Sequence, residues 1–469
     1  MSTALPSPSL TVSNGVVSLS KKATGIPGFD GITQGGLPRG RISAITGGPG
    51  AGKTVFALQV LVNWAKTLGE RGMFVSFEEP VANIRQNIAT LDWGASELVD
   101  SHLILSGVTG ARYDIQSLLQ SLSAEVARAG VRNIVFDGFD VLLADLEGEQ
   151  SERQEIARLC NWIKTHGLLG IITVKAATVG PRDLRRIDLV HYFTDCVIQL
   201  ESGLHGTAFA RALRILKYRG SGYASNLFPT VITRAGMEIV TGQDAHLHTA
   251  ISSERVSSGI QRLDTLLGGG YKRGASILVS GAPGTAKSSL AACFVNAACS
   301  RGERAVMLTF DESAKQITLN MRSVGLDLES HEKTKLLLLT SFHSALRSPE
   351  DHYLAVRDCL ETHAPTSLVI DPIYALMRRD YLFAVMITEG LVDYTKSRGI
   401  TFLLTSRLEQ EEDSTVSYLS MIADTWLQLS YVAQAGARNR ALSIVKSRAT
   451  AHSNEVHELR LSPAGLDLS

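Results

Sequence analysis

The sequence predicts an α/β protein with two tandem domains, each containing a mainly parallel sheet flanked by helices. Three observations predict this fold. The chain has 469 residues, which exceeds an ordinary single core and suits two domains of moderate size. Its two halves repeat one another, and within each half short apolar runs alternate with helical patterns. Such alternation is typical of a parallel sheet that is covered on both faces.

The repeat is clearest around two glycine-rich turns. Residues 25–54, GIPGFDGITQGGLPRGRISAITGGPGAGKT, match residues 259–288, GIQRLDTLLGGGYKRGASILVSGAPGTAKS, without a gap and at an offset of 234 residues. Asp137 in NIVFDGFD and Asp371 in SLVIDPIY keep the same offset. So constant a shift indicates a tandem duplication. The predicted parts are a flexible segment 1–17, a first domain 18–243, a linker 244–252 and a second domain 253–469.

The strands are predicted from apolar runs that lack polar alternation. Continuous apolar strands separated by helices indicate a parallel sheet, and ligands bind at the carboxyl ends of its strands. The two glycine-rich turns come at such ends. The predicted strands are ISAIT, GMFVSF, NIVF, GIITV and DCVIQL in the first half, and SILVS, AVMLTF, SLVID, ITFLLTS and TWLQLSYV in the second.

The first glycine-rich turn, from Gly47 to Thr54, satisfies the phosphate-binding pattern G-x-x-x-x-G-K-T in full. Glycines let backbone N–H groups wrap a triphosphate, and the helix that follows adds positive charge at its N-terminus. The lysine reaches the outer phosphates and the hydroxyl binds Mg²⁺. The predicted nucleotide-binding residues are Gly48, Pro49, Gly50, Ala51, Gly52, Lys53 and Thr54.

The second turn departs from the pattern at one position, where Ala286 replaces the last glycine. Because this position begins a helix, we expect a negative φ there and room for a methyl group. Lys287 and Ser288 remain, so nucleotide binding is predicted here too, with its affinity left open. The predicted binding residues are Ala282, Pro283, Gly284, Thr285, Ala286, Lys287 and Ser288.

Two strand-end aspartates, Asp137 and Asp371, are predicted to hold Mg²⁺ together with Thr54 and Ser288. An acid at this place binds the metal through water or through the hydroxyl of the phosphate-binding loop. The alternative is a helix cap, which is the commoner role of a lone aspartate at a strand end. Two aspartates in register with two such loops favour the metal site.

Paired acids follow another strand in each half. These are Glu78 and Glu79 in FVSFEEP, and Asp311 and Glu312 in MLTFDES. Beside a triphosphate they are candidate general bases, whereas elsewhere such a pair is an ordinary solvated loop. The shorter first acid of the second half would lie farther from the nucleophile. We therefore expect the two sites to differ in rate or in reaction.

Composition narrows the class of protein. The 46 basic and 46 acidic residues balance, so nothing in the net charge favours general binding to DNA. The five cysteines form no C-x-x-C pair and are interpreted as buried free thiols in a reducing compartment. The N-terminus does not resemble a signal peptide, and no apolar run is long enough to span a membrane. A cytoplasmic protein is expected.

With these motifs the chain resembles the KaiC family of RecA/DnaB-like P-loop ATPases, from about residue 18 onward. Two further segments carry the resemblance: ALRILKYRGS at 212–221 and IADTWLQLSYVAQAGARNRALSIVKSRAT at 422–450. They imply that Lys217 and Arg219, and likewise Lys446 and Arg448, reach a neighbour's nucleotide. Without the resemblance, these pairs would be interpreted as solvated surface charge. The resemblance also implies a two-tiered homo-hexamer with ATP between subunits.

The resemblance further implies that the first half hydrolyses ATP and that the second phosphorylates its own serine or threonine across the subunit interface. In EEDSTVSYLSMIADT, Ser420 aligns with the family's phosphorylated serine, whereas Met421 replaces the threonine beside it. Ser414 and Thr415 lie near a further phosphoacceptor position, with an ambiguous alignment. Asp311 would be the base of this reaction, supported by Glu312. A single phosphorylation on Ser420 is expected rather than a two-site cycle.

The chain stops at Ser469, where the clock protein continues into a tail that binds a regulatory partner, so a homologue outside the core clock is expected. Two alternatives remain open. One is a DNA-dependent motor or recombinase on the same P-loop core. The other is an ATP-gated scaffold that recruits a partner protein without catalysis.

Overall fold

The structure is a computed structural model in which two compact units can be described. One comprises Met1–Leu204 and Phe209–Thr241, and the other consists mainly of Gly242–Ser469. The linker predicted at 244–252 lies outside the described part except for its last residue. The described residues are 11–13, 16–108, 115–144, 146, 148–176, 181–205, 208–241, 252–310, 312–342, 348–373, 381–407, 414–434, 437–448 and 450–469.

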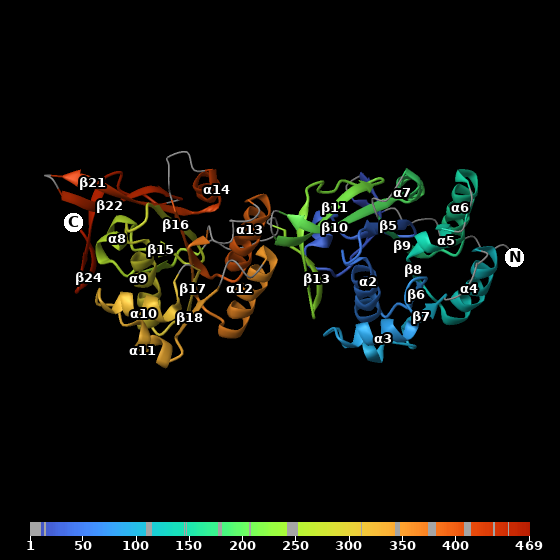
Figure 1. Ribbon diagram of the computed structural model, residues 1–469, viewed down its shortest axis with the longest axis horizontal. Coiled ribbons are helices and arrows are strands. Elements are labelled where there is room, and N and C mark those ends of the chain that lie inside the picture. Colours follow the sequence, from blue (N-terminus) through green and yellow to red (C-terminus); the bar gives the residue numbers. More distant parts are fainter. Residues whose placement is uncertain are drawn as a thin grey trace. The chain divides into compact units, whose positions relative to one another are not determined.

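Within its described residues the first unit contains a nine-stranded sheet (Figure 1). Neighbouring strands are parallel from β7 to β10 in the spatial order given below. The sheet continues through β11, β12 and β13, and β12 pairs antiparallel with both β11 and β13. In spatial order the strands are β7 (Leu103–Gly107), β6 (Gly72–Ser76), β8 (Asn133–Asp137), β9 (Leu169–Lys175), β5 (Ile42–Gly47), β10 (Cys196–His205), β11 (Ala208–Tyr218), β12 (Phe228–Thr233) and β13 (Gly236–Ile239).

The second unit repeats this order strand for strand in its described residues. Its strands are parallel from β18 to β21, and antiparallel pairs follow from β21 to β24. In spatial order they are β18 (Leu337–Ser341), β17 (Ala305–Thr309), β19 (Ser367–Asp371), β20 (Thr401–Arg407), β16 (Ser276–Gly281), β21 (Thr425–Gln434), β22 (Ala437–Ser447), β23 (Val456–Ser462) and β24 (Gly465–Leu468).

The predicted α/β fold is therefore confirmed, and each of the ten predicted strands is present. All six residues of β5 and all six of β16 are buried, which is why these central strands read as continuous apolar runs. The antiparallel strands at one end of each sheet were not predicted. β23 and β24 mix buried residues with exposed or half-buried ones, so they lack the continuous apolar signal, whereas β12 and β13 are mostly buried.

Helices cover both faces of the first sheet, with α2 on one face and α7 on the other (Figure 1). The apolar side chains of α4, α6 and α7 form one core cluster with β5, β6, β8 and β9. The long helix α2 ends at Gly69, whose left-handed φ of 63° closes its last turn. The helices are α1 (Phe29–Ile32), α2 (Lys53–Leu68), α3 (Val81–Ala89), α4 (Ile115–Ala129), α5 (Phe139–Ala144), α6 (Glu149–Thr165) and α7 (Pro181–Phe193), with a short 3₁₀ helix at Ala95–Glu97.

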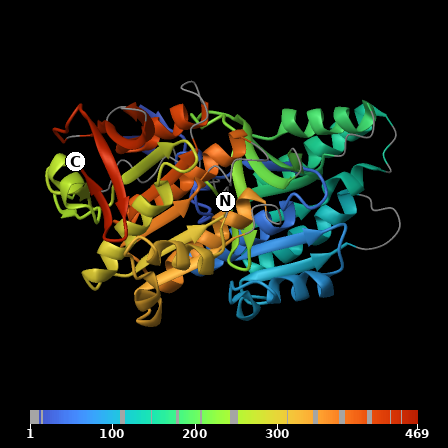
Figure 2. The same cartoon turned by 60° about the vertical axis from the view of Figure 1, so that its left-hand side comes forward.

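The second sheet is covered in the same way, with α9 and α14 on opposite sides of β16 (Figures 1 and 2). The buried side chains of α9 join those of α8, α10 and α11 in one core cluster. Helix α12 begins with a capping box in which Ser348 and Asp351 accept each other's backbone N–H. The helices are α8 (Gln261–Leu266), α9 (Lys287–Ser300), α10 (Ala314–Arg322), α11 (Leu328–Lys333), α12 (Pro349–His363), α13 (Tyr381–Ser397) and α14 (Ser414–Ile422).

A small repeated element precedes each sheet. In the first unit β3 (Lys21–Lys22) pairs with β4 (Leu37–Pro38), and in the second β14 (Arg255–Val256) pairs with β15 (Tyr271–Lys272). Asp30 accepts hydrogen bonds from the backbone of residues 24 and 25, and its counterpart Asp264 accepts one from the backbone N–H of residue 258. The matched aspartates of the repeat therefore stabilise a loop.

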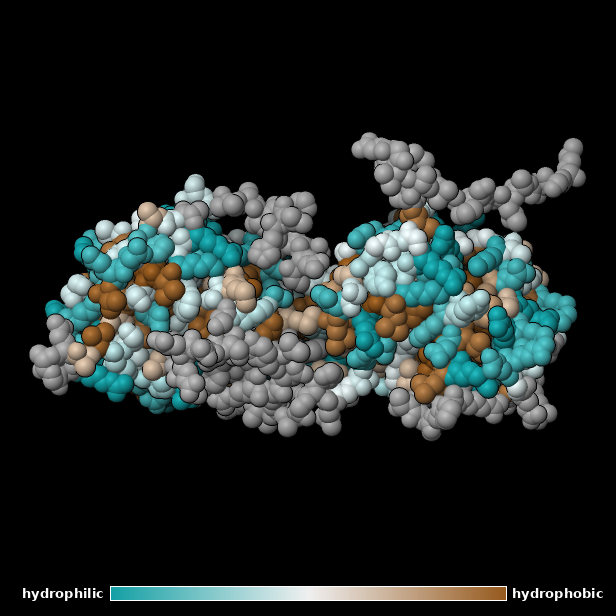
Figure 3. Space-filling view, turned by 90° about the horizontal axis from the view of Figure 1, so that it is seen from above, coloured by the Kyte–Doolittle hydropathy of each residue, from teal (hydrophilic) through white to brown (hydrophobic). Residues whose placement is uncertain are grey.

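The N-terminal segment predicted as flexible contains two short strands, β1 (Thr11–Ser13) and β2 (Val16–Ser18), which pair antiparallel. On the face shown in Figure 3, hydrophobic and hydrophilic residues are interspersed over the described surface. Among the described residues, the helices are all too short or too polar to cross a membrane.

Candidate nucleotide sites

The first phosphate-binding loop connects β5 to α2. Helix α2 begins at Lys53, and Gly52 before it has a left-handed φ of 97°. The ammonium group of Lys53 donates hydrogen bonds to the carbonyl oxygens of Gly47 at 2.9 Å and Gly48 at 3.0 Å. Burial lowers the pKa of Lys53, while the charge of Glu78 opposes that shift. The lysine therefore lies against the loop and close to an acid of the next strand.

A hydroxyl and carboxylate network stands beside this loop. Thr54 donates a hydrogen bond to Asp137 at 3.1 Å, and Thr173 donates one to the same carboxylate at 2.7 Å. Burial raises the pKa of Asp137, and the two hydroxyl donors counteract part of that shift. A carboxylate oxygen next to a threonine hydroxyl is the hard-oxygen donor set that Mg²⁺ prefers. The sequence predicted Thr54 and Asp137 together but did not identify Thr173.

The two glutamates after β6 have different surroundings. The side chain of Glu78 lies against Gly138, where an added Cβ would be 2.6 Å from Glu78 Cγ. Its pKa is raised by burial and by the charges of Asp140 and Asp137. Glu79 instead accepts a hydrogen bond from Asn87 of α3 at 2.9 Å. The charges of both glutamates thus interact with Asp137, and Glu79 is the one that is bonded to the following helix.

The second loop connects β16 to α9 with the same lysine geometry. Lys287 donates to the carbonyl oxygens of Gly281 at 2.8 Å and Ala282 at 2.9 Å. The expected negative φ at Ala286 is wrong, because the residue has a left-handed φ of 78°, like Gly52 in the first loop. The last residue before the helix must turn the chain left-handed, and an alanine pays a steric cost there that glycine avoids.

A pocket of about 280 Å³ adjoins this second loop. Five predicted site residues line it together with Arg407, which was not predicted; the five are Pro283, Lys287, Ser288, Glu312 and Asp371. Thr405 donates to the Asp371 carboxylate, as Thr173 does to Asp137. The second unit thus repeats the threonine–aspartate hydrogen bond of the first.

The acid pair of the second unit is described only in part. Asp311 lies outside the described residues. Glu312 accepts a hydrogen bond from Asn320 of α10 at 2.8 Å, which repeats the bond between Asn87 and Glu79. The second acid of each pair is therefore tied to the following helix in both units.

Two arginines that the sequence analysis missed contact the tips of the loops. Arg211 of β11 donates to the carbonyl oxygen of Gly50 at 3.1 Å, and Arg440 of β22 donates to that of Gly284 at 3.0 Å. The two arginines match at an offset of 229 residues. The repeat continues beyond the two aspartates, where its offset falls from 234 to 229 residues. Aligning the two halves at this shorter offset would have matched the two arginines.

The first Lys-x-Arg pair, Lys217 and Arg219, lies at the C-terminal end of α7. Lys217 donates to the carbonyl oxygens of His191 at 2.5 Å and Thr194 at 2.7 Å, and Arg219 donates to that of Tyr192 at 2.9 Å. Burial lowers the pKa of Lys217, and the charge of Arg219 lowers it further. These cations are held by the carbonyl groups that a helix leaves unpaired at its end.

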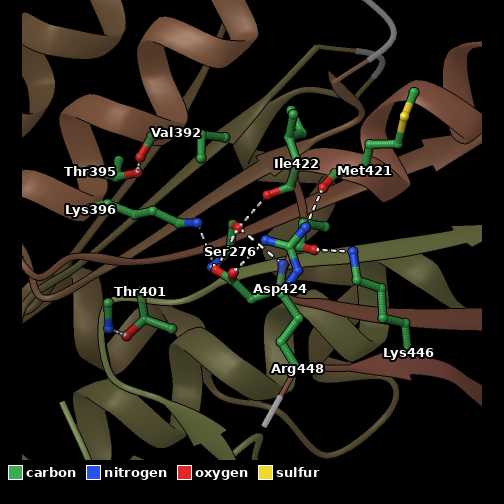
Figure 4. Close-up of polar contacts among 12 residues, drawn as sticks. Ser276, Val392, Thr395, Lys396, Thr401, Met421, Ile422, Asp424, Lys446 and Arg448 are labelled. Carbon is green, nitrogen blue, oxygen red and sulfur yellow. Dashed lines mark hydrogen bonds and ion pairs between the residues drawn. The ribbon is translucent and has the colours of Figure 1, made fainter. Parts of the chain in front are cut away.

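The second pair, Lys446 and Arg448, binds the end of α14 in the same way (Figure 4). Lys446 donates to the carbonyl oxygens of Ser420 at 2.7 Å and Ala423 at 2.8 Å, and Arg448 donates to that of Met421 at 2.7 Å. The interpretation as solvated surface charge therefore misses these contacts in both units.

Asp424 anchors this second pair to the sheet. Lys396 and Arg448 approach its carboxylate from different sides, at 2.9 and 3.5 Å (Figure 4). Burial alone would raise the pKa of Asp424, but the charge of Lys396 and hydrogen bonds from Ser276 lower it overall. The matching Asp195 of the first unit lies 3.6 Å from Arg41 and 3.9 Å from Arg219.

Both pairs lie at the edge of the sheet that is formed by the N-terminal ends of the parallel strands, and the phosphate-binding loop of the same unit lies at the C-terminal ends. The backbone N–H of Asp195 donates to Ile42 at the start of β5, and that of Asp424 to Ser276 at the start of β16. The loops follow the other ends of these six-residue strands, about 17 Å away at the usual rise per residue. Neither pair can therefore contact the phosphates of its own site.

Ser420 lies on α14 at the same edge as Lys446 and is partly buried. Its backbone oxygen accepts the lysine, so the predicted phosphoacceptor and the second cation pair are adjacent. The helix includes Ser414 and Thr415, but their side chains lie outside the described residues.

The second loop has a further pocket on its other side, and the first unit has a hollow whose lining includes no residue of its loop. In the first unit Thr90, Leu91, Thr233 and Arg234 line an open hollow between α3 and the β12–β13 turn. In the second, Ala286, Val324, Arg440 and Leu461 line a pocket between α10 and β23. The pocket of the second unit also includes Lys287 and Ser288, so it continues that phosphate site. The two loops, each with its lysine, hydroxyl residue and strand-end aspartate, define two P-loop nucleotide-binding domains.

Comparison with known proteins identifies the family. The family model described as "ATPase: KaiC" matches residues 22–244 and again residues 256–468. The chain therefore belongs to the KaiC family of ATP-binding P-loop ATPases, and its two units are tandem RecA-like domains.

Its relatives are clock proteins by name. Over 468 residues, which cover 96% of this chain and 82% of the relative, the chain is 38% identical to the circadian clock protein KaiC2 of Synechocystis sp.. Over 467 residues, covering 96% and 89%, it is 31% identical to the circadian clock oscillator protein KaiC of Synechococcus elongatus. The predicted domain boundaries and residue roles remain predictions.

Proposed function

We propose that this protein hydrolyses ATP in its first domain, transfers phosphate to Ser420 in its second, and works as a cytoplasmic homo-hexamer that regulatory proteins could bind. One observation carries the proposal. In both units the P-loop, hydroxyl and aspartate lie at one edge of the sheet, and a Lys-x-Arg pair lies at the opposite edge. A head-to-tail contact would bring one copy's cations to the next copy's nucleotide.

In the first site, this chain's residues hold and orient the triphosphate. The loop from Gly48 to Thr54 supplies backbone N–H groups, and Lys53 exchanges its two carbonyl partners for phosphate oxygens. Thr54 and Asp137 would hold Mg²⁺, which neutralises phosphate charge when bound. Thr173 keeps the Asp137 carboxylate turned toward Thr54 by its hydrogen bond.

Glu78 is the proposed general base of hydrolysis. It would take a proton from the attacking water while the γ-phosphoryl group leaves ADP. Its raised pKa, caused by burial and by the two nearby aspartates, makes it a better proton acceptor than an ordinary glutamate. Glu79, bonded to Asn87, supports the loop.

In the second site, Lys287, Ser288 and Asp371 would bind Mg-ATP in the same manner. The γ-phosphoryl group would pass to the hydroxyl oxygen of Ser420 of a neighbouring copy, ADP would leave, and an acid at Asp311 would take the serine proton, with Glu312 in support. The position of Ser420 beside Lys446, far from its own P-loop, favours transfer between copies.

The decisive experiment measures both reactions on one sample. The purified chain is incubated with Mg-ATP, ADP release is followed, and the intact mass is taken before phosphate is mapped. One added phosphoryl group that disappears in Ser420→Ala supports the kinase assignment, whereas phosphate on Ser414 or Thr415 moves the acceptor. ADP release without added mass would leave an ATPase and reject the kinase step.

Ring assembly is tested by complementation. Lys53→Ala and Arg219→Ala each damage one side of the proposed first-domain interface. When the two variants are co-expressed, about a quarter of the interfaces in a randomly mixed ring would carry both intact residues. Recovered ATP hydrolysis of that order supports action between copies. Activity no higher than that of either variant alone would contradict it.

A further inference from the structure

We propose that Arg407 binds the terminal phosphate of ATP in the second site of its own chain. This inference rests on the proposed nucleotide binding by that site, and it adds a residue that distinguishes ATP from ADP. It differs from the Lys446 and Arg448 pair, which lies at the other edge of the sheet and could reach only another copy.

Strand register places Arg407 at the P-loop. β20 runs parallel to β16, and Arg407 is directly opposite Gly281, the last residue of β16. Gly281 begins the loop, and its carbonyl oxygen already accepts a hydrogen bond from Lys287 at 2.8 Å. The arginine is therefore one strand spacing from the start of the phosphate cradle.

The side chain of Arg407 faces the metal side of the cradle. Residues two apart on a strand share a face, and Thr405, two residues earlier, donates to the Asp371 carboxylate. Arg407 in turn lines the same pocket as Ser288, Glu312 and Asp371. This pocket is where the outer phosphates and Mg²⁺ would lie if the P-loop binds in the usual manner.

The charge distribution agrees with this geometry. Burial lowers the pKa of Lys287 first of all, the charge of Asp371 raises it, and the charge of Arg407 lowers it again. Two cations that repel each other across a pocket favour an anion between them. A planar guanidinium group can donate two parallel hydrogen bonds to a phosphate, so it suits the terminal group of ATP.

The first unit offers a matched contrast. Lys175 holds the corresponding place, opposite Gly47. Lys175 lies near two acids. Its backbone N–H donates a hydrogen bond to Asp140 at 2.9 Å, and the charge of Lys175 lowers the pKa of Glu78. At the Asp140 offset of 234 the second half has Tyr374, which is outside the described residues. The end of this strand therefore carries a lysine in the first unit and an arginine in the second.

The test compares ATP with ADP at equilibrium. Binding of radiolabelled ADP and of a radiolabelled ATP analogue that cannot be hydrolysed is measured by equilibrium dialysis on the full chain, on Arg407→Ala, on Arg407→Gln and on Arg407→Lys. In the alanine and glutamine variants we expect one of two sites per chain to lose ATP affinity about tenfold to a hundredfold, the usual range for a hydrogen bond to a charged group. ADP affinity at that site should change less than twofold, and lysine should restore part of the loss.

Arg460→Ala is the matched control, because Arg460 is exposed and pairs only with Glu458 among its described partners of opposite charge. The same measurements on Lys53→Ala identify which site is lost. Equal loss of ATP and ADP in the Arg407 variants, or no loss of either, would overturn the inference while leaving the second site a nucleotide site. A wild-type chain that binds one nucleotide, lost in Lys53→Ala, would overturn both proposals.

Discussion

Gly52 and Ala286 occupy the same position in the two P-loops, and both have left-handed backbones, with φ of 97° and 78°. An added Cβ on Gly52 would lie 2.6 Å from Met237 and 2.7 Å from Ile232. At the corresponding places the second unit has Leu466 and Leu461, and the methyl group of Ala286 packs against that unit's core. A departure from the P-loop pattern is thus accommodated by two changed neighbours.

The comparison extends to charged residues at the far end of the helix that follows each P-loop. Glu70 and Glu303 hold matching positions after α2 and α9. Glu70 pairs with Lys22, which is only 3% exposed, whereas Glu303 pairs with Arg273 and Arg301 nearer the surface. Repetition therefore preserved the acid and the phosphate cradle, while partners outside the cradle diverged.

The largest expected effect separates the two sites by their lysines. Lys53→Ala should remove most ADP release, and Lys287→Ala should remove phosphate transfer to Ser420, each by about a hundredfold or more, because a lysine clamp on phosphoryl oxygens is lost. ADP assays and intact mass measure the two reactions. Lys333→Ala, an exposed lysine paired with Glu329, is the control. Equal hydrolysis by both P-loop variants, with phosphate transfer unchanged, would contradict the division of labour.

The second prediction concerns the paired glutamates. Glu78→Gln should slow first-domain hydrolysis by about a hundredfold, as expected for a lost general base, and Glu79→Gln by only a few-fold. Because the pKa of Glu78 is raised, the wild-type rate should fall with decreasing pH while ordinary glutamates are still ionised. Rates across pH on a Lys287→Ala background measure this. Equal losses in the two variants would reject Glu78 as the distinct base.

The third prediction exchanges the residues at the helix start. Gly52→Ala should lower the free energy of unfolding of the first domain by about 2 to 4 kcal/mol, from left-handed strain and overpacking combined. Ala286→Gly should change that of the second domain by less than about 1 kcal/mol, because relief of strain and loss of the packed methyl group oppose each other. Thermal and denaturant unfolding measure both. Equal effects would mean that the neighbouring side chains do not decide the outcome.

The smallest expected effect depends on pH. Burial raises the pKa of Glu303, but hydrogen bonds from Arg273, Arg301 and Thr366 hold it at about 2. A lowered pKa stabilises the fold above the unfolded value of 4.5, and this stabilisation is lost as pH falls toward 2. Glu303→Gln should lower the free energy of unfolding of the second domain by about 1 to 2 kcal/mol at neutral pH. It should also make that free energy depend less on pH in the acid range, which is the acid limb of the stability curve. An unchanged acid limb would reject the assignment.

Much of each site could be predicted from the sequence because its residues are local. Lys53, Thr54 and their counterparts lie within one strand–turn–helix segment, and Asp137 and Asp371 end apolar runs at a constant offset. Thr173, Arg211 and Arg407 could not be assigned in this way. Each belongs to a strand far along the chain, and only sheet order places it beside the loop.

The sequence by itself determined the duplication, the α/β class and the two phosphate cradles, because a repeated motif and continuous apolar strands are local patterns. Only the tertiary structure decided that Ala286 is left-handed, since a backbone angle depends on how the following helix joins the strand. Only the tertiary structure, likewise, put the Lys-x-Arg pairs on carbonyl groups at the edge away from their own nucleotide. The direction in which the strands run in the sheet decides at which edge the pairs lie, and no single segment of the sequence encodes that direction.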